Sequence, residues 1–288
     1  MKKTIKKTIK KTFIKKTIKK TIKKTIKKSL KKKFKKSLKK SANKKICFVS
    51  TYIGNKNFME GNNNFKKNPN YDYLFFTNLD KSYYNDSSWK IVQVNINDIE
   101  PIKNIISNVK ISRYFKFKVN DYITKYLGKK YDYIFYCDCW LYPKYNVNWN
   151  MLCAKINKSK FGMIQYKHPV AKKGIAGDLK QIVKMKKDTA SNINKTKIFL
   201  KKISKKVDLS KPVYFENAIF GFSTKKNNVI NFLEEYWKYY LNCPTYRDQP
   251  LWNFLLLKNN LQPVTYNLKS FFGGKKILNR KINHYKSK

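Results

Sequence analysis

The chain has 288 residues, enough for one large domain or two small ones, and carries a formal net charge of +50 from 66 basic and 16 acidic residues. It contains no apolar run long enough to span a membrane, and its N-terminus lacks the apolar core of a secretory signal peptide. Five cysteines without a disulfide-framework spacing, beside only two histidines, argue against a zinc site and predict buried free thiols in a reducing, cytoplasmic compartment.

Residues 1–43 are a degenerate repeat of KKTI and later KKSL, and the first 45 residues contain 23 lysines and no acid. An apolar residue at every fourth position drifts by about 40° per step on an α-helix, so no single apolar face forms. Lysine repulsion also opposes folding, which predicts a disordered or transiently helical tail. Either the tail binds a polyanion or an anionic membrane surface, or it is a solvated product of repeat slippage. The rest of the chain is also basic, and its abundant Lys, Asn, Ile, Tyr and Phe all have AT-rich codons, which offers genome drift as an alternative to function.

After residue 44, segments typical of strands alternate with segments of helical spacing. The expected strands are 45–53, 73–78, 89–96, 131–137 and 161–169, with a strand or hairpin at 213–223, and the expected helices are 112–127, 175–203, 228–241 and 248–260. Ser112 is the expected N-cap of the first helix and Gly128 its C-terminal stop. Asp248 is the expected N-cap of the last helix, with Pro250 in its first turn. The alternation predicts an α/β fold with a mostly parallel sheet, and neither a GxGxxG nor a P-loop motif is present.

The run YDYIFYCDCW, residues 131–140, places one carboxylate directly after a strand with apolar residues on both faces. Asp138 cannot remain ionised, buried and unpaired, because removing a lone carboxylate from water is too costly. Ligands of open α/β sheets bind at the carboxyl edge, where such a strand ends. We therefore expect Asp138 to reach a cleft there, in a position to hold a divalent cation or a sugar hydroxyl.

Several motifs follow these elements in order. They are YDYLFFTN (71–78), SRYFKFKVNDYI (112–123) leading into YDYIFYCDCW, His168-Pro169 after a strand, ENAIFGFS (216–223) and Arg247-Asp248-Gln249 at a helix start. Together they resemble a family of GT-A-type glycosyltransferase-like domains found in bacteria, plants and large DNA viruses. The resemblance covers about residues 45–270. It implies a GT-A-like domain over 44–288, a three-layer αβα sandwich with a mostly parallel central sheet, preceded by the basic tail.

The resemblance also implies a chemistry and a set of residues. Members that act as transferases use a nucleoside-diphosphate sugar, usually with Mn²⁺ or Mg²⁺, and here the acceptor is unknown. The implied residues are Asp138 and His284 for the metal, Asp248 and Glu216 for catalysis, and Thr51, Asn78, Arg113, Lys116, His168 and Gln249 for binding of donor or substrate. The sequence departs from the family pattern where Asp138-Cys139-Trp140 replaces D-x-D, and where Asn78 and Asn217 replace an acid and a glycine.

Each candidate also has a structural explanation. Among the acids, Asp138 would form a strand-end hydrogen bond, Asp248 would cap its helix and Glu216 would form an internal ion pair. Arg113 and Lys116 would lie on a solvated helix face, Gln249 would face solvent in a first turn, and His168 would have a packing role.

Two other functions compete with glycosyl transfer. One is a non-catalytic polyanion-binding protein with a degenerate GT-A-like domain. The other is an amide hydrolase, which would need more metal ligands than two histidines suggest. If the chain is viral, the host cytoplasm or the virion is its expected place.

Overall fold

The computed structural model describes residues 44–168 and 173–274, so the basic tail and His284 lie outside the described residues. Its central sheet has seven strands in the order β3-β2-β1-β4-β7-β6-β8. Their bounds are β1 Ile46–Tyr52, β2 Asp72–Thr77, β3 Lys90–Gln93, β4 Tyr133–Cys137, β6 Met163–Lys167, β7 Phe215–Ser223 and β8 Val264–Thr265. All neighbours pair in parallel except β7, which is antiparallel to both β4 and β6. The predicted α/β class with a mostly parallel sheet is confirmed, and its flanking helices are consistent with a GT-A-like sandwich.

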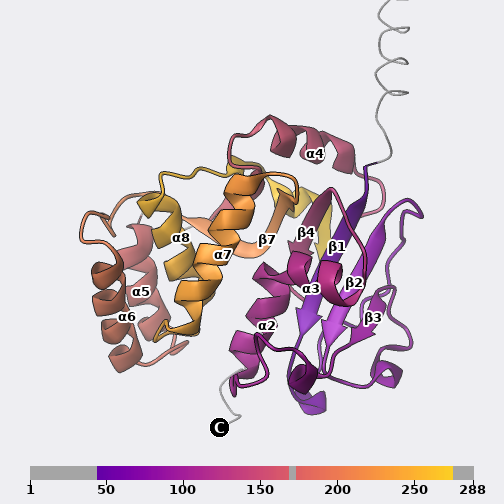
Figure 1. Ribbon diagram of the computed structural model, residues 1–288, viewed down its shortest axis with the longest axis horizontal. Helices are drawn as coiled ribbons and strands as arrows, with labels where there is room; N and C mark the ends of the chain where they lie inside the picture. The colour runs from indigo at the N-terminus through magenta and orange to yellow at the C-terminus, as the bar shows by residue number, and fades with distance from the viewer. Residues whose placement is uncertain (1–43, 169–172, 275–288) are drawn as a thin grey trace, which may run out of the picture. The chain divides into compact units, whose positions relative to one another are not determined.

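Helices cover both faces of this sheet (Figure 1). Their bounds are α2 Asn108–Phe117, α3 Val119–Tyr126, α4 Trp149–Lys158, α5 Gly174–Lys184, α6 Ala190–Ile203, α7 Asn227–Leu241 and α8 Asp248–Lys258. One core lies between the sheet and the helices α2, α3, α7 and α8, with α5 and α6 packed beyond α8. The second core lies under α4 and a two-stranded sheet formed by β5 (Leu141–Pro143) and β9 (Phe272–Gly274).

The central strand β4 shows why the sheet takes this position. Its five residues are all buried, and successive side chains alternate between the two cores. Ile134 and Tyr136 enter the first core, whereas Phe135 and Cys137 enter the second. A strand with apolar residues on both faces must be covered on both sides, as the sequence pattern indicated.

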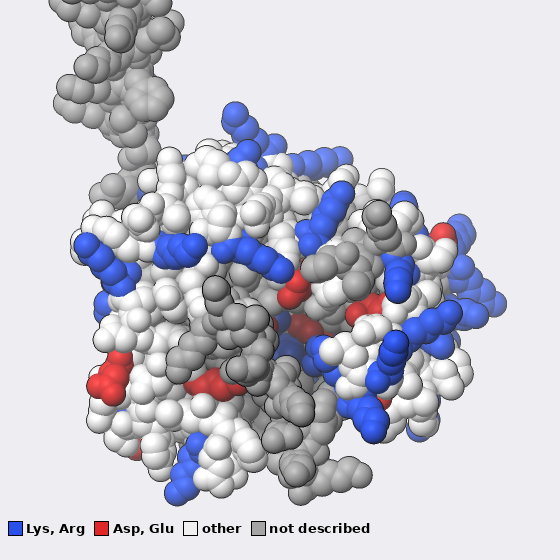
Figure 2. Space-filling view, turned by 180° about the vertical axis from the view of Figure 1, so that it is seen from behind, with Lys and Arg blue, Asp and Glu red and all other residues white. Residues whose placement is uncertain are grey.

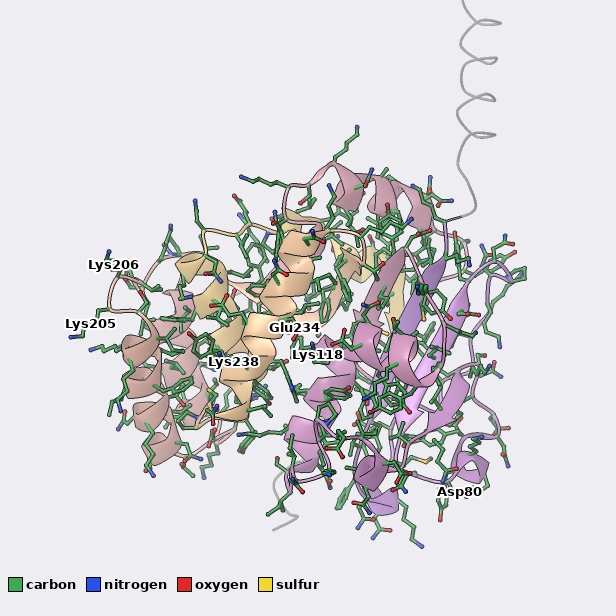
Figure 3. The ribbon with its side chains drawn as sticks, in the orientation of Figure 1. Asp80, Lys118, Lys205, Lys206, Glu234 and Lys238 are labelled. Carbon is green, nitrogen blue, oxygen red and sulfur yellow. The ribbon has the colours of Figure 1, made fainter. Side chains whose placement is uncertain are left out.

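The predicted helix over 112–127 is wrong in two respects. It begins four residues earlier, where the Ser107 side chain accepts a hydrogen bond from the Lys110 amide, and Ser112 instead bonds back to the Val109 carbonyl. It is also divided at Lys118, whose backbone leaves the helical region and whose side chain pairs with Glu234 of α7 (Figure 3). After the division, α3 packs into the first core through Val119, Tyr122 and Ile123. Gly128 follows the helix with φ of +62°, as its expected stop requires.

Other predicted elements need smaller corrections. The helical stretch 175–203 is two helices, α5 and α6, because the chain turns at Lys186 with a positive φ and restarts with Thr189 as N-cap. Residues 213–223 give the single strand β7 rather than a hairpin, and the third strand is only four residues long. The helix α4 and the strands β5, β8 and β9 were not predicted. The five cysteines form no disulfide with one another and four of them are buried, as the sequence indicated.

Candidate functional site

Three strands bring their ends together at one edge of the sheet. Because β7 is antiparallel, its first residues lie where β4 and β6 finish. The Asp138 amide donates to the Ala218 carbonyl at 2.9 Å, and the His168 amide donates to the Tyr214 carbonyl at 2.9 Å. Asp138, His168 and Glu216 are therefore placed by the backbone at the carboxyl edge, where open α/β sheets bind their ligands.

A cavity of about 170 Å³ opens at this edge. Side chains of α2 and the start of α8 approach it from one side, and α5 closes another. Its lining residues are Arg113, Lys116, Asp138, His168, Asp178, Gln181, Ile182, Met185, Lys187, Glu216, Asn217, Ala218, Arg247, Asp248 and Gln249. Seven of these were predicted from the sequence as site residues, although they lie on five separate segments of the chain.

The ammonium group of Lys116 is at the centre of the charged network. It lies 3.3 Å from Asp138 Oδ1 and 3.0 Å from Asp248 Oδ2, and its side chain is only 2% exposed. The Tyr136 ring lies 4.8 Å below the ammonium, and the Tyr136 hydroxyl donates to Asp138 at 3.1 Å. Asp138 itself is one-third exposed, so one end of this chain of contacts faces the cavity.

A second cation reinforces the pair. Arg113 Nε lies 3.3 Å from Asp248 Oδ2, and the Asp248 side chain is nearly inaccessible to solvent. Burial alone would raise the pKa of Asp248, but Lys116, Arg113 and Arg247 hold that pKa well below its usual range. Burial likewise opposes the charge of Arg113, yet the neighbouring Asp248 raises the pKa of the guanidinium. Both groups stay ionised in the fold.

The prediction that Asp248 caps α8 is wrong. Arg247 occupies the N-cap position, Asp248 is the first helical residue, and no side chain caps this helix. A capping carboxylate must fold back onto the amides of its own first turn. Here the carboxylate reaches across to α2, because two buried cations there attract it more strongly than the exposed end of one helix would.

Asp178 was not predicted, yet it lies in the cavity wall. It is buried on α5, accepts a hydrogen bond from the Tyr214 hydroxyl and has a pKa raised mainly by burial. A signal was available in the sequence. Asp178 is the only acidic residue between Asp138 and Asp188, and it stands three residues after Ile175 and four before Ile182, on the apolar face of its helix.

Glu216 and His168 complete the wall. Glu216 is half-buried and accepts a hydrogen bond from Tyr166, whose own pKa is raised by burial and then by Glu216. The His168 ring meets the Tyr214 ring edge-on, with 5.5 Å between centroids. Burial and then Arg247 lower the pKa of Lys187, and neither of these two cations was predicted as a site residue.

Thr51 and Asn78 do not line this cavity. The Thr51 hydroxyl donates to the Phe76 carbonyl at 3.1 Å. The Asn78 amide bonds both backbone groups of Gly54, at 2.9 and 3.2 Å, and so joins the loops after β1 and β2. Their role in donor binding stays a prediction, since both lie near the same sheet edge but on other strands.

The charged residues that line the cavity differ in composition from those of the whole chain, because acids and arginines are enriched among them. Four of the 16 acidic residues line it, Asp138, Asp178, Glu216 and Asp248, and so do two of the three arginines, Arg113 and Arg247. Lysines spread widely over the face shown in Figure 2, whereas its few acidic side chains lie mostly near the middle. Compositional drift toward lysine does not explain a cavity in which four acids face two arginines and two lysines.

The donor set does not by itself fit a divalent cation held by protein side chains. Within residues 44–168 and 173–274, no three His, Cys, Asp or Glu side chains are grouped so that they could hold a metal. The Lys116 ammonium already lies between the carboxylates of Asp138 and Asp248. Mg²⁺ is often held by one or two carboxylates together with substrate phosphates, so the expected Mn²⁺ or Mg²⁺ stays a prediction.

No protein-family model and no curated protein matches this sequence. Among solved structures, the chain is similar to the bifunctional glycosyltransferase WbbM in its apo form, with 12% identity and a TM-score of 0.48. The similarity covers 80% of this chain and 40% of that one, so the chain spans about two fifths of the neighbour's length. A likeness this weak has no bearing on activity or substrate.

In the part of the chain that the structure describes, none of the helices has both the length and the apolar character needed to cross a membrane.

Proposed function

We propose that this chain is a glycosyltransferase, which moves a sugar from a nucleoside-diphosphate sugar to an acceptor. One observation supports this above the others: seven of the ten residues predicted for the site line one cavity at the carboxyl edge of the sheet. That cavity combines buried cations, which suit a diphosphate, with carboxylates, which suit sugar hydroxyls.

In the proposed reaction the bond between the anomeric carbon and the diphosphate breaks, and the acceptor oxygen forms a new bond to that carbon. Negative charge develops on the departing diphosphate. Arg113, Lys116 and Arg247 lie together at the cavity and would stabilise this charge. Two of the three are arginines, whose planar guanidinium matches phosphate oxygens in two places at once.

The acceptor hydroxyl must lose a proton during the transfer. Asp248 is a poor general base, because its carboxylate is held by two cations and its pKa lies far below neutral. We assign it instead to positioning Lys116 and Arg113. Glu216 is half-buried at the cavity wall and is the better placed base.

Asp138 is assigned to the donor, where its exposed oxygen would accept from sugar hydroxyls. The Tyr136 hydroxyl and Lys116 fix the other side of the carboxylate. A bound Mn²⁺ or Mg²⁺ would add Lewis-acid stabilisation of the diphosphate. The protein residues described above bind and orient their partners independently of that contribution.

Release of nucleoside diphosphate from a panel of nucleotide sugars, with and without Mn²⁺, tests the proposal. We expect one donor to be turned over, and Asp138→Asn to lower the rate by about 10²-fold or more, as loss of a preorganised polar contact does. Asp80→Asn is the matched control, because Asp80 is an exposed acid that caps a short loop helix. Absence of turnover and of any donor-induced melting shift across the panel would contradict transferase activity.

A further inference from the structure

An irregularity in the sheet places one amide beside the cavity. The register of β6 and β7 jumps between Gln165 and Tyr166: Gln165 lies opposite Phe220, but Tyr166 lies opposite Glu216. Residues 217–219 therefore form a bulge in β7. Bulges often turn a side chain away from its regular direction next to a functional site. Asn217 stands at the start of this bulge and lines the cavity.

A relay of side-chain amides fixes which atom Asn217 can offer. The indole N–H of Trp252 donates to Gln165 Oε1 at 3.1 Å, and an indole can only donate. Gln165 must therefore use its amino group toward Asn217, and Gln165 Nε2 donates to Asn217 Oδ1 at 3.0 Å. Because the oxygen of Asn217 is taken, its amino group Nδ2 is the part of the side-chain amide left for another partner.

That amino group has no hydrogen-bond partner among the described residues, although Asn217 is only 1% exposed. Folded proteins rarely leave a buried donor unpaired, because it loses its bonds to water and gains nothing in return. Asn253, equally buried, shows the usual outcome: its oxygen accepts from the Phe215 amide, and its amino group donates to two carbonyls. Asn217 is oriented by the hydrogen bond from Gln165, but its Nδ2 donor has no acceptor among the described residues.

We propose that Asn217 Nδ2 donates a hydrogen bond to a hydroxyl oxygen of the sugar bound in the cavity, and so helps to select that sugar. This rests on the proposed transferase function. A sugar hydroxyl both donates and accepts, and the carboxylates of Asp138 and Glu216 can only accept from it. An amide donor among them supplies the complementary half of the recognition.

The size of the cavity agrees with a sugar ring. Its volume of about 170 Å³ is enough for several water molecules, and so for a group the size of a sugar ring. With the diphosphate at the cations of the cavity, the nucleoside would lie outside it, and Asn217 would contact only the sugar. The effect of Asn217 should therefore appear with nucleotide sugars and not with the matching nucleoside diphosphates.

The test compares binding of nucleotide sugars, their nucleoside diphosphates and monodeoxy analogues of the preferred sugar by calorimetry. In the wild-type protein, one deoxy position should weaken binding about tenfold, the size expected for one hydrogen bond. Asn217→Ala should lose about the same factor with the full sugar, lose nothing further with that deoxy sugar, and bind the nucleoside diphosphate unchanged. Its melting temperature should fall less than that of the control Asn253→Ala, because Gln165 Nε2 keeps its hydrogen bond to the Glu216 carbonyl, whereas Asn253 makes three hydrogen bonds.

The outcomes separate the two proposals. If wild-type protein binds a nucleotide sugar and Asn217→Ala binds it equally well, the role of Asn217 is wrong and the transferase proposal stands. If no deoxy position weakens wild-type binding, the role of Asn217 is again wrong, and this arm needs no variant to fold. If wild-type protein responds to no nucleotide sugar and no nucleoside diphosphate, both proposals are overturned.

Discussion

Two cavities at opposite edges of the sheet contain similar residues in different surroundings. At the amino edge, a cavity of about 430 Å³ is lined by residues around Asp72 and Lys129, whose side chains lie 3.0 Å apart and are both more than 40% exposed. At the carboxyl edge, the smaller cavity holds Lys116 against Asp138 and Asp248, and the Lys116 side chain is 2% exposed. The larger cavity is thus the one without buried charge.

Burial of charge, rather than volume or residue type, distinguishes the edge that we propose as the functional one. An exposed lysine–carboxylate pair is stabilised little, since water and salt screen it. A buried lysine loses its hydration and therefore needs carboxylates close to its ammonium group. Buried ionisable groups of this kind cluster at functional sites. Two of the chain's three arginines are also at the carboxyl edge, and neither is at the amino edge.

The largest expected effect comes from removing the buried cation. Lys116→Ala leaves Asp248 with one cation fewer in a site closed to solvent, and should lower the free energy of unfolding by about 3 kcal/mol or more. Lys129→Ala at the amino edge should cost less than about 1 kcal/mol. Urea unfolding of both variants measures this. Lys116→Met separates charge from packing, because a Met variant as stable as the wild type would show that the ammonium charge contributes nothing.

A smaller effect concerns the acid side of the stability curve. The pKa of Asp248 is lower in the fold than its unfolded value of about 3.9, so its ionised form stabilises the protein above that pH, and this contribution is lost as pH falls toward the folded pKa. Asp248→Asn should therefore make unfolding free energies less dependent on pH between about pH 5 and pH 2. Asp72→Asn should flatten the curve much less, since Asp72 is exposed. Equal flattening in the two variants would contradict the contrast between the edges.

Asp178 should show the opposite sign. Burial raises its pKa in the fold, so the folded state favours the protonated form, and stability declines as pH rises through that raised pKa. Asp178→Asn removes the buried charge and keeps an oxygen for the Tyr214 hydroxyl. We expect the variant at pH 7 to be as stable as the wild type or more stable by about 1 kcal/mol or less. A clear loss of stability at pH 7, measured by thermal unfolding, would show that ionised Asp178 is stabilising.

Local patterns predicted what local interactions determine. The buried run of β4, the alternation of strands and helices, and the glycine stop after α3 each depend on neighbouring residues, and each was found. The convergence of Asp138, Lys116 and Asp248 needed more than local pattern. It required motifs in a known order, because the three residues are distant in sequence and meet only through the sheet.

The features that the sequence did not predict depend on contacts between elements that are distant in the chain. Lys118, where the helix divides, pairs with Glu234 of α7, and the Asp248 carboxylate contacts cations on α2 instead of capping its own helix. Asn217 is oriented by Trp252 through Gln165, a relay across three elements. None of these has a signature in the spacing of nearby residues. The scarcity of acids and arginines in this chain was a usable signal, since a rare residue type that survives against such a composition has a reason to remain.

The smallest effect on the folded domain should come from deleting residues 1–43, which hold 21 lysines and lie outside the described residues. If the tail binds polyanions, its deletion should lower affinity for heparin or nucleic acid and flatten the salt dependence, because fewer counterions are released. The melting temperature and donor turnover should not change, since every charge of the cavity belongs to residues 113–249. A tail-less chain that keeps the same polyanion affinity and salt slope would assign that binding to the basic surface of the domain instead. Loss of donor turnover on deletion would instead show that the tail takes part in the reaction, and the cavity alone would then be insufficient for transfer.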